Sequence, residues 1–414
     1  VEDYNKLYDL AKDIYRKLPS EFNDAYYQLV LYPVEACANL YEMYFYTAKN
    51  HFYASQKRAA TNDMAERVKI LYNKDAQITN YYNTILSGGK WNHMMDQTHI
   101  GYTYWQQPDS NTMPKVQYIK LDDISEMGVW VDGSDDYYPN SNILATPELN
   151  IFEKNNTFLE VFNRGNKPFD IKVISNNSFL MLSDTSGMIN KEKRIIIAID
   201  WSKVPEGKTM GQVEIITGNQ KVIVNVPLSN YSNSLLKDFK GYVETSGYVM
   251  MDASNFTNVV TDSVIKWVVI DNLGRRNSAV TVKPSYIEEY RITSNSPRIE
   301  YNFFVFDTGK CVISSFLSPT LNFNENIGLV YGISIDDEAP QLVRIHEDVS
   351  LKKWEWEVAN NIKIHSTQHF IKNKGKHTLK FWLVSPGIVL QNILIDFGGA
   401  KSCYLGPPNS YFVK

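Results

Sequence analysis

The stretch GGKWNHMMDQTHIGYTYWQQP, from Gly88 to Pro108, separates two kinds of sequence. It holds two Trp, two His, two Met and two Tyr, with one carboxylate, Asp96, and almost no aliphatic residues. Apolar residues before it recur at helical spacing, whereas those after Pro108 alternate as they do in strands. The stretch therefore marks the change from a helical to a β-rich region.

Residues 1–87 are predicted to form three or four antiparallel helices. The first has apolar residues at helical spacing until Pro19 interrupts the pattern: Leu7, Leu10, Ala11, Ile14 and Leu18. Pro33 indicates a kink or a boundary in the next segment, and Gly88 and Gly89 end the last helix. This part of the chain is predicted to be a helical bundle.

The rest of the chain is predicted to be all-β, so the fold class is a multidomain α plus all-β protein. Residues 88–145 form a joint and connector, residues 146–228 an immunoglobulin-like β-sandwich, and residues 237–414 a jelly-roll or galactose-binding-like β-sandwich without intervening helices. FWLVSPGIVLQNILID (381–396) predicts a hairpin that turns at Pro386–Gly387. KKWEWEV (352–358) predicts a strand with Trp354 and Trp356 on one face.

Composition excludes several classes of partner. Lys plus Arg minus Asp plus Glu is 42 − 46 = −4 and no basic run occurs, so we expect no nucleic acid. No apolar run is long enough to span a bilayer. The three cysteines, Cys37, Cys311 and Cys403, show neither a disulfide framework nor a zinc spacing, and Cys37 is expected to be a small buried residue of a helix. We expect no cofactor.

Candidate catalytic chemistry is sparse in this sequence. His93 and His99 lie six residues apart with Asp96 between them, which fits no standard metal motif and favours hydrogen-bonding histidines. VDGSDDYYPN (131–140) is predicted to be a solvated turn. A calcium loop is the alternative, but the spacing of its aspartates does not match the EF-hand pattern. SIDDEAP (334–340) places Asp336 and Glu338 at a strand end, but a glycosidase needs two carboxylates about 5–9.5 Å apart across a cleft.

Aromatic residues leave two interpretations open. The 27 Tyr and 8 Trp suit sugar binding, because a flat apolar ring stacks on a sugar face while its polar edge stays wet, but they also suit a core. The Trp residues concerned are Trp105, Trp130, Trp267, Trp354, Trp356 and Trp382.

Three stretches together resemble glycoside hydrolase family 115, the xylan α-1,2-glucuronidases. They are GGKWNHMMDQTHIGYTYWQQP (88–108), HTLKFWLVSPGIVLQNILIDFGGAKSCYLGPPNS (377–410), and the pair DAYYQLVLYPVEACANLY (24–41) and YVETSGYVMMDASNF (242–256). Family members are about twice as long and carry an N-terminal domain and a catalytic barrel before a helical domain and β-sandwiches. The resemblance is to the part after the barrel, and since this chain starts at Val1 without Met we expect it to be a piece of a longer protein.

This resemblance implies that the catalytic residues lie outside the chain, which alone is expected to be inactive. It implies an enzyme whose substrate is xylan or a related uronic-acid-bearing polysaccharide, in which this chain serves as a scaffold, forms dimer contacts and helps to position the substrate. The barrel is then its partner domain. The resemblance also implies export to the periplasm or the cell exterior. An independent carbohydrate-binding module is the alternative. Residues 88–108 are expected to be a joint between helices and β region. If part of the stretch instead faces a pocket, the substrate-binding candidates are His93, Asp96, His99 and Trp105, to which the second motif adds Trp382 and Tyr404.

Overall fold

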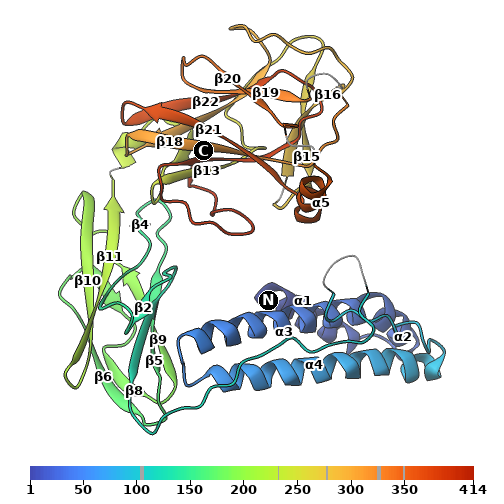
Figure 1. Cartoon of the computed structure of the whole chain (residues 1–414), viewed down its shortest axis with the longest axis vertical. Helices are drawn as coiled ribbons and strands as arrows, with labels where there is room; N and C mark the ends of the chain where they lie inside the picture. The colour runs from blue at the N-terminus through green and yellow to red at the C-terminus, as the bar shows by residue number, and fades with distance from the viewer. Residues whose placement is uncertain (103–106, 232, 277, 324–327, 348–349) are drawn as a thin grey trace. The chain divides into compact units, whose positions relative to one another are not determined.

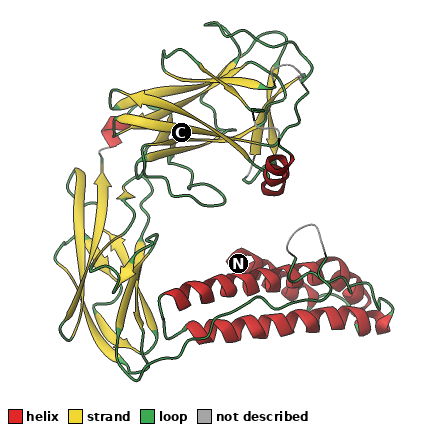
Figure 2. Cartoon of the chain, in the orientation of Figure 1, coloured by secondary structure: helices red, strands yellow, loops and turns green. Residues whose placement is uncertain are grey.

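The computed structural model describes residues 1–102, 107–231, 233–276, 278–323, 328–347 and 350–414. The chain divides into two compact units. The first comprises residues 1–146, 156–198 and 211–225, and the second comprises residues 147–155, 199–210 and 226–414. The long helices belong to the first unit (Figure 2). The predicted order of helices first and β-sandwiches after them is confirmed.

Two long antiparallel helices dominate the N-terminal region (Figure 1). The helical elements are α1 (Glu2–Tyr15), η1 (Ser20–Phe22), α2 (Asn23–Tyr26), η2 (Tyr27–Leu31), α3 (Tyr32–Ser55), α4 (Thr61–Thr84) and η3 (Leu86–Gly89). Pro33 lies in the first turn of α3, directly after the π-helical turn η2, so the predicted boundary is confirmed. The prediction that Cys37 is buried is wrong, because Cys37 is exposed on α3 while its neighbours Ala38 and Asn39 are buried.

Residues 88–108 do not form the expected joint, as far as they are described. Trp91 and Met95 pack on Tyr82 and Leu86, and Ile100 is buried in a second cluster of helix residues. The contact between helices and sheet is made instead by the turn between α3 and α4, where the Ala59 N–H donates to the Asn163 carbonyl at 2.7 Å. The stretch marks the change in sequence pattern, but Trp91, Met95 and Ile100 pack with the helices.

The connector returns along the helices and is held by two asparagines, the buried Asn50 and the half-buried Asn62. The Asn50 side chain accepts from the Gln117 N–H at 2.7 Å and donates to the Gln117 carbonyl at 2.9 Å. Asn62 pairs in the same way with Ile119, at 2.9 and 3.0 Å. A side-chain amide matches both hydrogen-bonding groups of one backbone residue, so each asparagine substitutes for a neighbouring strand.

The first sandwich begins before the predicted boundary at residue 146. One sheet has the strand order β2 (Tyr137–Tyr138), β1 (Met127–Val131), β5 (Thr157–Asn163), β9 (Glu192–Ile199), β7 (Leu180–Leu182). The other has the order β3 (Ile143–Ala145), β11 (Gln220–Asn230), β10 (Gly207–Thr217), β6 (Phe169–Ser175), β8 (Ser186–Ile189), and β4 (Leu149–Asn150) also pairs with β11. Val129 lies opposite Val161, so β1, which we placed in the connector, is an integral strand of this sandwich.

The second sandwich follows the short helix η4 (Asn233–Leu236). One sheet has the order β20 (Gln341–Arg344), β19 (Val330–Ile335), β22 (Gly375–Leu383), β17 (Arg298–Val305), β12 (Gly241–Val243), β24 (Phe412–Val413), and β14 (Asn258–Val260) also pairs with β17. The other has the order β15 (Lys266–Asp271), β16 (Ser278–Lys283), β23 (Leu390–Asp396), β18 (Gly309–Leu317), β21 (Lys363–Ile371), and β13 (Tyr248–Asp252) also pairs with β23. Tyr301 and Phe381 from the first sheet and Ile313 and Ile393 from the second meet in one core.

Two local predictions for this sandwich are wrong. Residues 381–396 are not a hairpin, because β22 and β23 lie in different sheets and the Pro386–Gly387 turn carries the chain from one sheet to the other. KKWEWEV is not a strand but part of helix α5 (Leu351–Asn360), which interrupts the β region. Ser350 caps this helix, since its side chain accepts from the Lys353 N–H at 3.4 Å, and Asn361 ends it in the left-handed conformation.

Candidate binding site

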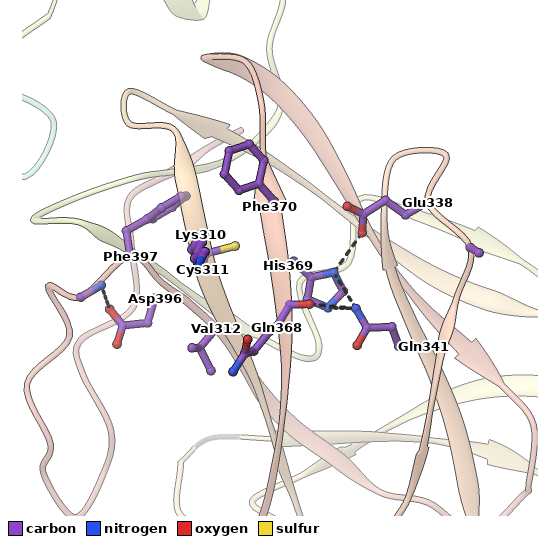
Figure 3. A pocket seen from close by; sticks show the side chains of 12 residues that line it. Lys310, Cys311, Val312, Glu338, Gln341, Gln368, His369, Phe370, Asp396 and Phe397 are labelled. Atoms are coloured by element: carbon purple, nitrogen blue, oxygen red, sulfur yellow. Dashed lines mark hydrogen bonds and ion pairs between the residues drawn. The ribbon is translucent and has the colours of Figure 1, made fainter.

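A large depression lies at the edge of the second sandwich, around β21 (Figure 3). Its volume is about 790 Å³. Strand pairing decides which side chains face it, because antiparallel partners point to the same face of a sheet. Lys310 lies opposite Phe370, and Val312 lies opposite both Gln368 and Asp396. All five line the depression.

Aromatic carbon is exposed at this site. The Phe370 side chain is 53% exposed, an unusual position for a Phe on a sheet. Phe397 lines the same hollow and packs partly on the core. Asp396 holds the loop that follows β23, because its Oδ1 accepts from the Gly398 N–H at 2.7 Å and from the Ala400 N–H at 3.1 Å. The loop therefore places an apolar ring beside a fixed carboxylate.

The other wall is a hydrogen-bonded polar group. His369 Nδ1 lies 2.9 Å from Glu338 Oε2, and His369 Nε2 lies 2.9 Å from Thr367 Oγ1. Gln341 Nε2 donates to the Gln368 carbonyl at 2.9 Å, which satisfies one backbone group of the edge strand. The buried imidazole thus fixes Glu338, whose side chain is 40% exposed at the rim.

This arrangement supports binding better than catalysis. Both imidazole nitrogens of His369 are already engaged. The Cys311 thiol is buried, and burial raises its pKa to about 12, so it does not supply a thiolate nucleophile near neutral pH. No group of three or more metal-ligating side chains was found within the described ranges. What the depression offers is an exposed ring, amides and charges of both signs.

The sequence-predicted residues of the helical region are not among those that line this hollow. His93 and Asp96 form an exposed pair, with 2.6 Å between Nδ1 and Oδ2, and Asn83 donates to the other Asp96 oxygen at 2.8 Å. His99 Nε2 lies 3.0 Å from the buried Asp75 carboxylate, and this hydrogen bond raises the pKa of His99. These contacts are the hydrogen-bonding roles predicted for the two histidines. Trp105 lies outside the residues that the structure describes.

Trp382 and Tyr404, the two candidates from the second motif, differ in exposure. Trp382 is 6% exposed, its indole N–H donates to Ser334 Oγ at 3.0 Å, and the Arg298 guanidinium lies 4.5 Å from its ring centroid. It is therefore a covered residue and not a sugar platform. Tyr404 is 60% exposed, with Arg275 stacked 4.0 Å from its ring centroid.

Phe370, Lys310 and Gln368 were missed by the sequence reasoning. A signal exists in KIHSTQHFI (363–371), where Phe370 is out of phase with the buried His369 and Ile371. A large apolar residue on the polar phase of an edge strand indicates an exposed ring.

The described fold is a helical region followed by two β-sandwiches, and one family model matches its last part. Residues 241–409 match the model of the Glycosyl hydrolase family 115 C-terminal domain. The match runs from the first residue of β12 and contains every residue of the depression. The resemblance to glycoside hydrolase family 115 is therefore confirmed over residues 241–409.

Other comparisons add little to that assignment. A comparison with curated proteins found no match. Among solved structures, a family 115 4-O-methyl-α-glucuronidase with specificity for decorated arabinogalactans is 13% identical, with a TM-score of 0.47, over 95% of this chain and 32% of that chain. The C-terminal family 6 carbohydrate-binding module of a laminarinase from Zobellia galactanivorans is 12% identical, with a TM-score of 0.25, over 36% of this chain and 98% of that one. A family 35 module from Clostridium thermocellum is 15% identical, with a TM-score of 0.24, over 36% and 97%.

The chain spans about a third of the length of the first of these structures. Within the described residues, no helix is both long and apolar enough to cross a membrane.

Proposed function

We propose that the chain is the C-terminal accessory region of a glycoside hydrolase that removes α-1,2-linked glucuronic acid or its 4-O-methyl ether from glucuronoxylan. The observation that carries the proposal is the family match over residues 241–409. In this view the chain supports the fold and positions substrate, and catalytic groups come from a barrel outside it. Dimer contacts through the helices and export from the cytoplasm belong to the same proposal.

The depression at β21 supports a positioning role. Phe370 offers a ring on which a sugar face can stack, and its register partner Lys310 places an ammonium group beside that ring. A glucuronic acid side chain carries a carboxylate that such an ammonium group attracts. Gln368 and Asp396, on the same face, provide hydrogen-bonding groups for hydroxyls.

Substrate binding can be tested with two polymers that differ only in the uronic acid. We expect the purified chain to bind glucuronoxylan in affinity electrophoresis and to release no uronic acid. Phe370→Ala should weaken binding about tenfold, which corresponds to about 1.4 kcal/mol. Lys310→Met should weaken binding of glucuronoxylan by about threefold, within the range of an exposed charge pair, and leave binding of xylan without side chains unchanged.

Ile364→Ala is the matched control, because Ile364 is 45% exposed on the same strand but does not line the depression. Release of uronic acid by the pure chain would contradict the accessory role. Equal binding by the wild type and by Phe370→Ala would show that the depression at β21 has no part in substrate positioning.

An independent carbohydrate-binding module is the second candidate. The exposed Phe370 and the closed core of the second sandwich favour it, because such a domain could bind glycans without a catalytic partner. It predicts binding that is equally strong for several unrelated polysaccharides, whereas the first proposal predicts a preference for uronic-acid-bearing xylan.

A further inference from the structure

A second hollow in the same sandwich differs from the first in residues and in chemistry. It has a volume of about 240 Å³. Its walls come from the segment after β18, from the segment after β20, from α5 and from the first residue of β21: Thr320, Leu321, Asn322, His346, Trp354, Glu357 and Lys363. None of these residues lines the depression at β21.

Helix α5 builds this hollow. Trp354 and Glu357 are three residues apart, so they lie on the same face of the helix, while Trp356 points elsewhere and is 55% exposed. Asn361, with φ of 51°, reverses the chain directly after the helix. The reversal brings Lys363 Nζ to 2.8 Å from Glu357 Oε2.

The ion pair is buried, and both of its side chains are only 3% exposed. Removing two charges from water costs more than their attraction alone usually returns, so a buried pair is weak evidence for stability. The ammonium group has three N–H donors and the carboxylate has two oxygens, so their mutual bond leaves capacity for a ligand. Two neighbouring hydroxyls of one sugar ring match this capacity, because one can donate to Glu357 and the other can accept from Lys363.

Among the residues that the structure describes, the rest of the lining is uncharged. The Leu329 N–H donates to His346 Nδ1 at 3.2 Å, so Nδ1 carries no proton, and Nε2 donates to the Thr320 carbonyl at 2.8 Å. His346 is therefore a fixed neutral wall. Trp354 adds a flat aromatic surface of the kind that stacks on the C–H face of a sugar.

We propose that this hollow binds one neutral sugar ring that carries two adjacent hydroxyls. Its volume is below the roughly 300–1,000 Å³ of common small-molecule pockets, so it accommodates a single ring and not a run of chain. Lys363 is already neutralised by Glu357, and an added carboxylate would leave a buried negative charge without a partner. The site therefore selects against uronic acids, whereas the depression at β21 selects for them. It uses other residues and can fail independently of the proposed function.

A pair of matched ligands tests this directly. Methyl β-D-xylopyranoside and methyl β-D-glucuronopyranoside share the same ring and the same ring hydroxyls, and the second adds one carboxylate. We expect the full chain carrying Phe370→Ala, in which the depression at β21 is weakened, to bind the xyloside in the millimolar range, detected by calorimetry and by Trp fluorescence. The same variant should bind the glucuronide at least about tenfold more weakly, a difference of 1.4 kcal/mol.

Variants locate the binding. Trp354→Ala should abolish xyloside binding and Trp354→Phe should retain part of it, whereas Trp356→Ala, on the same helix but outside the hollow, should leave it unchanged. The double variant Glu357→Gln with Lys363→Met leaves no buried charge behind and should also abolish binding. Far-ultraviolet circular dichroism checks each fold, and the double variant and Trp354→Phe keep the test decisive if Trp354→Ala does not fold.

The proposal would be overturned by no xyloside binding at 50 mM, by equal binding of the glucuronide to the Phe370→Ala chain, or by xyloside binding that survives Trp354→Ala or the double variant. Loss of xyloside binding in Phe370→Ala would assign the ligand to the other hollow and would also overturn it. Loss of glucuronoxylan binding in Phe370→Ala, with xyloside binding intact, concerns only the function proposed above.

Discussion

At the scale of single residues, Arg58 has the most demanding position in the first unit. Its side chain is 0% exposed, its Nη1 lies 2.7 Å from Glu160, and its guanidinium stacks 4.2 Å from the ring centroid of Phe162 and 4.3 Å from that of Tyr53. It lies in the turn between α3 and α4, so it joins helices to sheet. Burial raises the pKa of Glu160, but hydrogen bonds from Arg58 and Arg194 outweigh burial and lower it overall.

We expect Arg58→Met to lower the free energy of unfolding by about 2–4 kcal/mol, somewhat less than for a fully orphaned charge, because Arg194 still pairs with Glu160 at 2.7 Å. Since the folded pKa of Glu160 is lowered, the stability it contributes is present above the ordinary Glu pKa and is lost as pH falls. The variant should therefore lose less stability on acidification than the wild type. Urea unfolding at pH 7 and pH 4 measures both effects.

Arg67→Met is the matched control for this change. Arg67 also pairs with a carboxylate, Glu42, at 2.6 Å, but its side chain is 42% exposed, so the cost should stay below about 1 kcal/mol. Equal losses from both arginines would contradict the importance of burial.

Glu244 is the residue whose titration should be most visible in the second unit. It is 4% exposed, and its Oε2 accepts from the Phe306 and Asp307 N–H groups at 2.6 and 3.0 Å. Burial raises its pKa to about 7, with the Asp307 carboxylate adding to the shift and the backbone hydrogen bonds and Lys208 opposing it.

A raised folded pKa means that stability is fully present below the unfolded pKa and is lost as pH rises through the folded one. We expect the wild-type free energy of unfolding to fall by roughly 2–3 kcal/mol between pH 4.5 and pH 7, and Glu244→Gln to remove this loss. Denaturant titrations across that range test it, with the exposed Glu288→Gln as the control that should keep the wild-type profile. A Glu244→Gln profile as steep as the wild type would contradict the assignment.

At the scale of elements, the sequence predicts types well where several signals agree and fails where one signal stands alone. The strands around Phe158, Ile196 and Val224 were recognised because alternation, β-branched residues and turns coincide. Alternation alone predicts a strand at KKWEWEV, although Ser350 and Asn361 supply a cap and a stop for a helix.

The sheet that each strand joins, and the segments that cover it, could not be predicted from the local sequence pattern. The Pro386–Gly387 turn gives the same local signal in a hairpin and in a crossover between sheets, and only the packing of β22 and β23 decides. Trp382 and Phe370 both lie in strands, but only Trp382 is covered. Its strand neighbour Gly332 lies against Ile292, and the Arg298 guanidinium lies over the Trp382 ring. Exposure of an aromatic residue therefore depends on what the distant chain covers.

The end of α5 tests its assignment as a helix. Asn361 adopts φ of 51° and ψ of 37°, which Ala tolerates poorly and Gly tolerates well. We expect Asn361→Ala to lower the free energy of unfolding by about 1–2 kcal/mol and Asn361→Gly to change it by less than about 0.5 kcal/mol. Urea unfolding followed by Trp fluorescence measures both, and equal costs for the two variants would contradict the left-handed cap.

At the scale of the whole molecule, three hydrophobic clusters each lie within a single unit, even though strands of the first sandwich contribute to both units. The largest cluster, around Tyr301 and Ile393, consists only of residues of the second unit, and the clusters around Tyr82 and Met43 consist only of residues of the first. The sequence predicted the order of helical and β regions for this reason, because each region satisfies its own hydrophobic pattern. It could not place the boundary of the first sandwich, because β1 pairs with β5 across a long intervening segment.

Separate cores should unfold separately. We expect calorimetry of the full chain at pH 7 to show two transitions, since all-or-none unfolding usually holds for one core and fails for chains with several. Arg58→Met should lower the midpoint of one transition, and Asn361→Ala should lower the midpoint of the other, because Arg58 lies in the first unit and Asn361 in the second. A shift of about 2–4 °C per kcal/mol is expected for units of this size. A single transition that both variants shift alike would show that the two units fold as one, and stability could then no longer be assigned to either core alone.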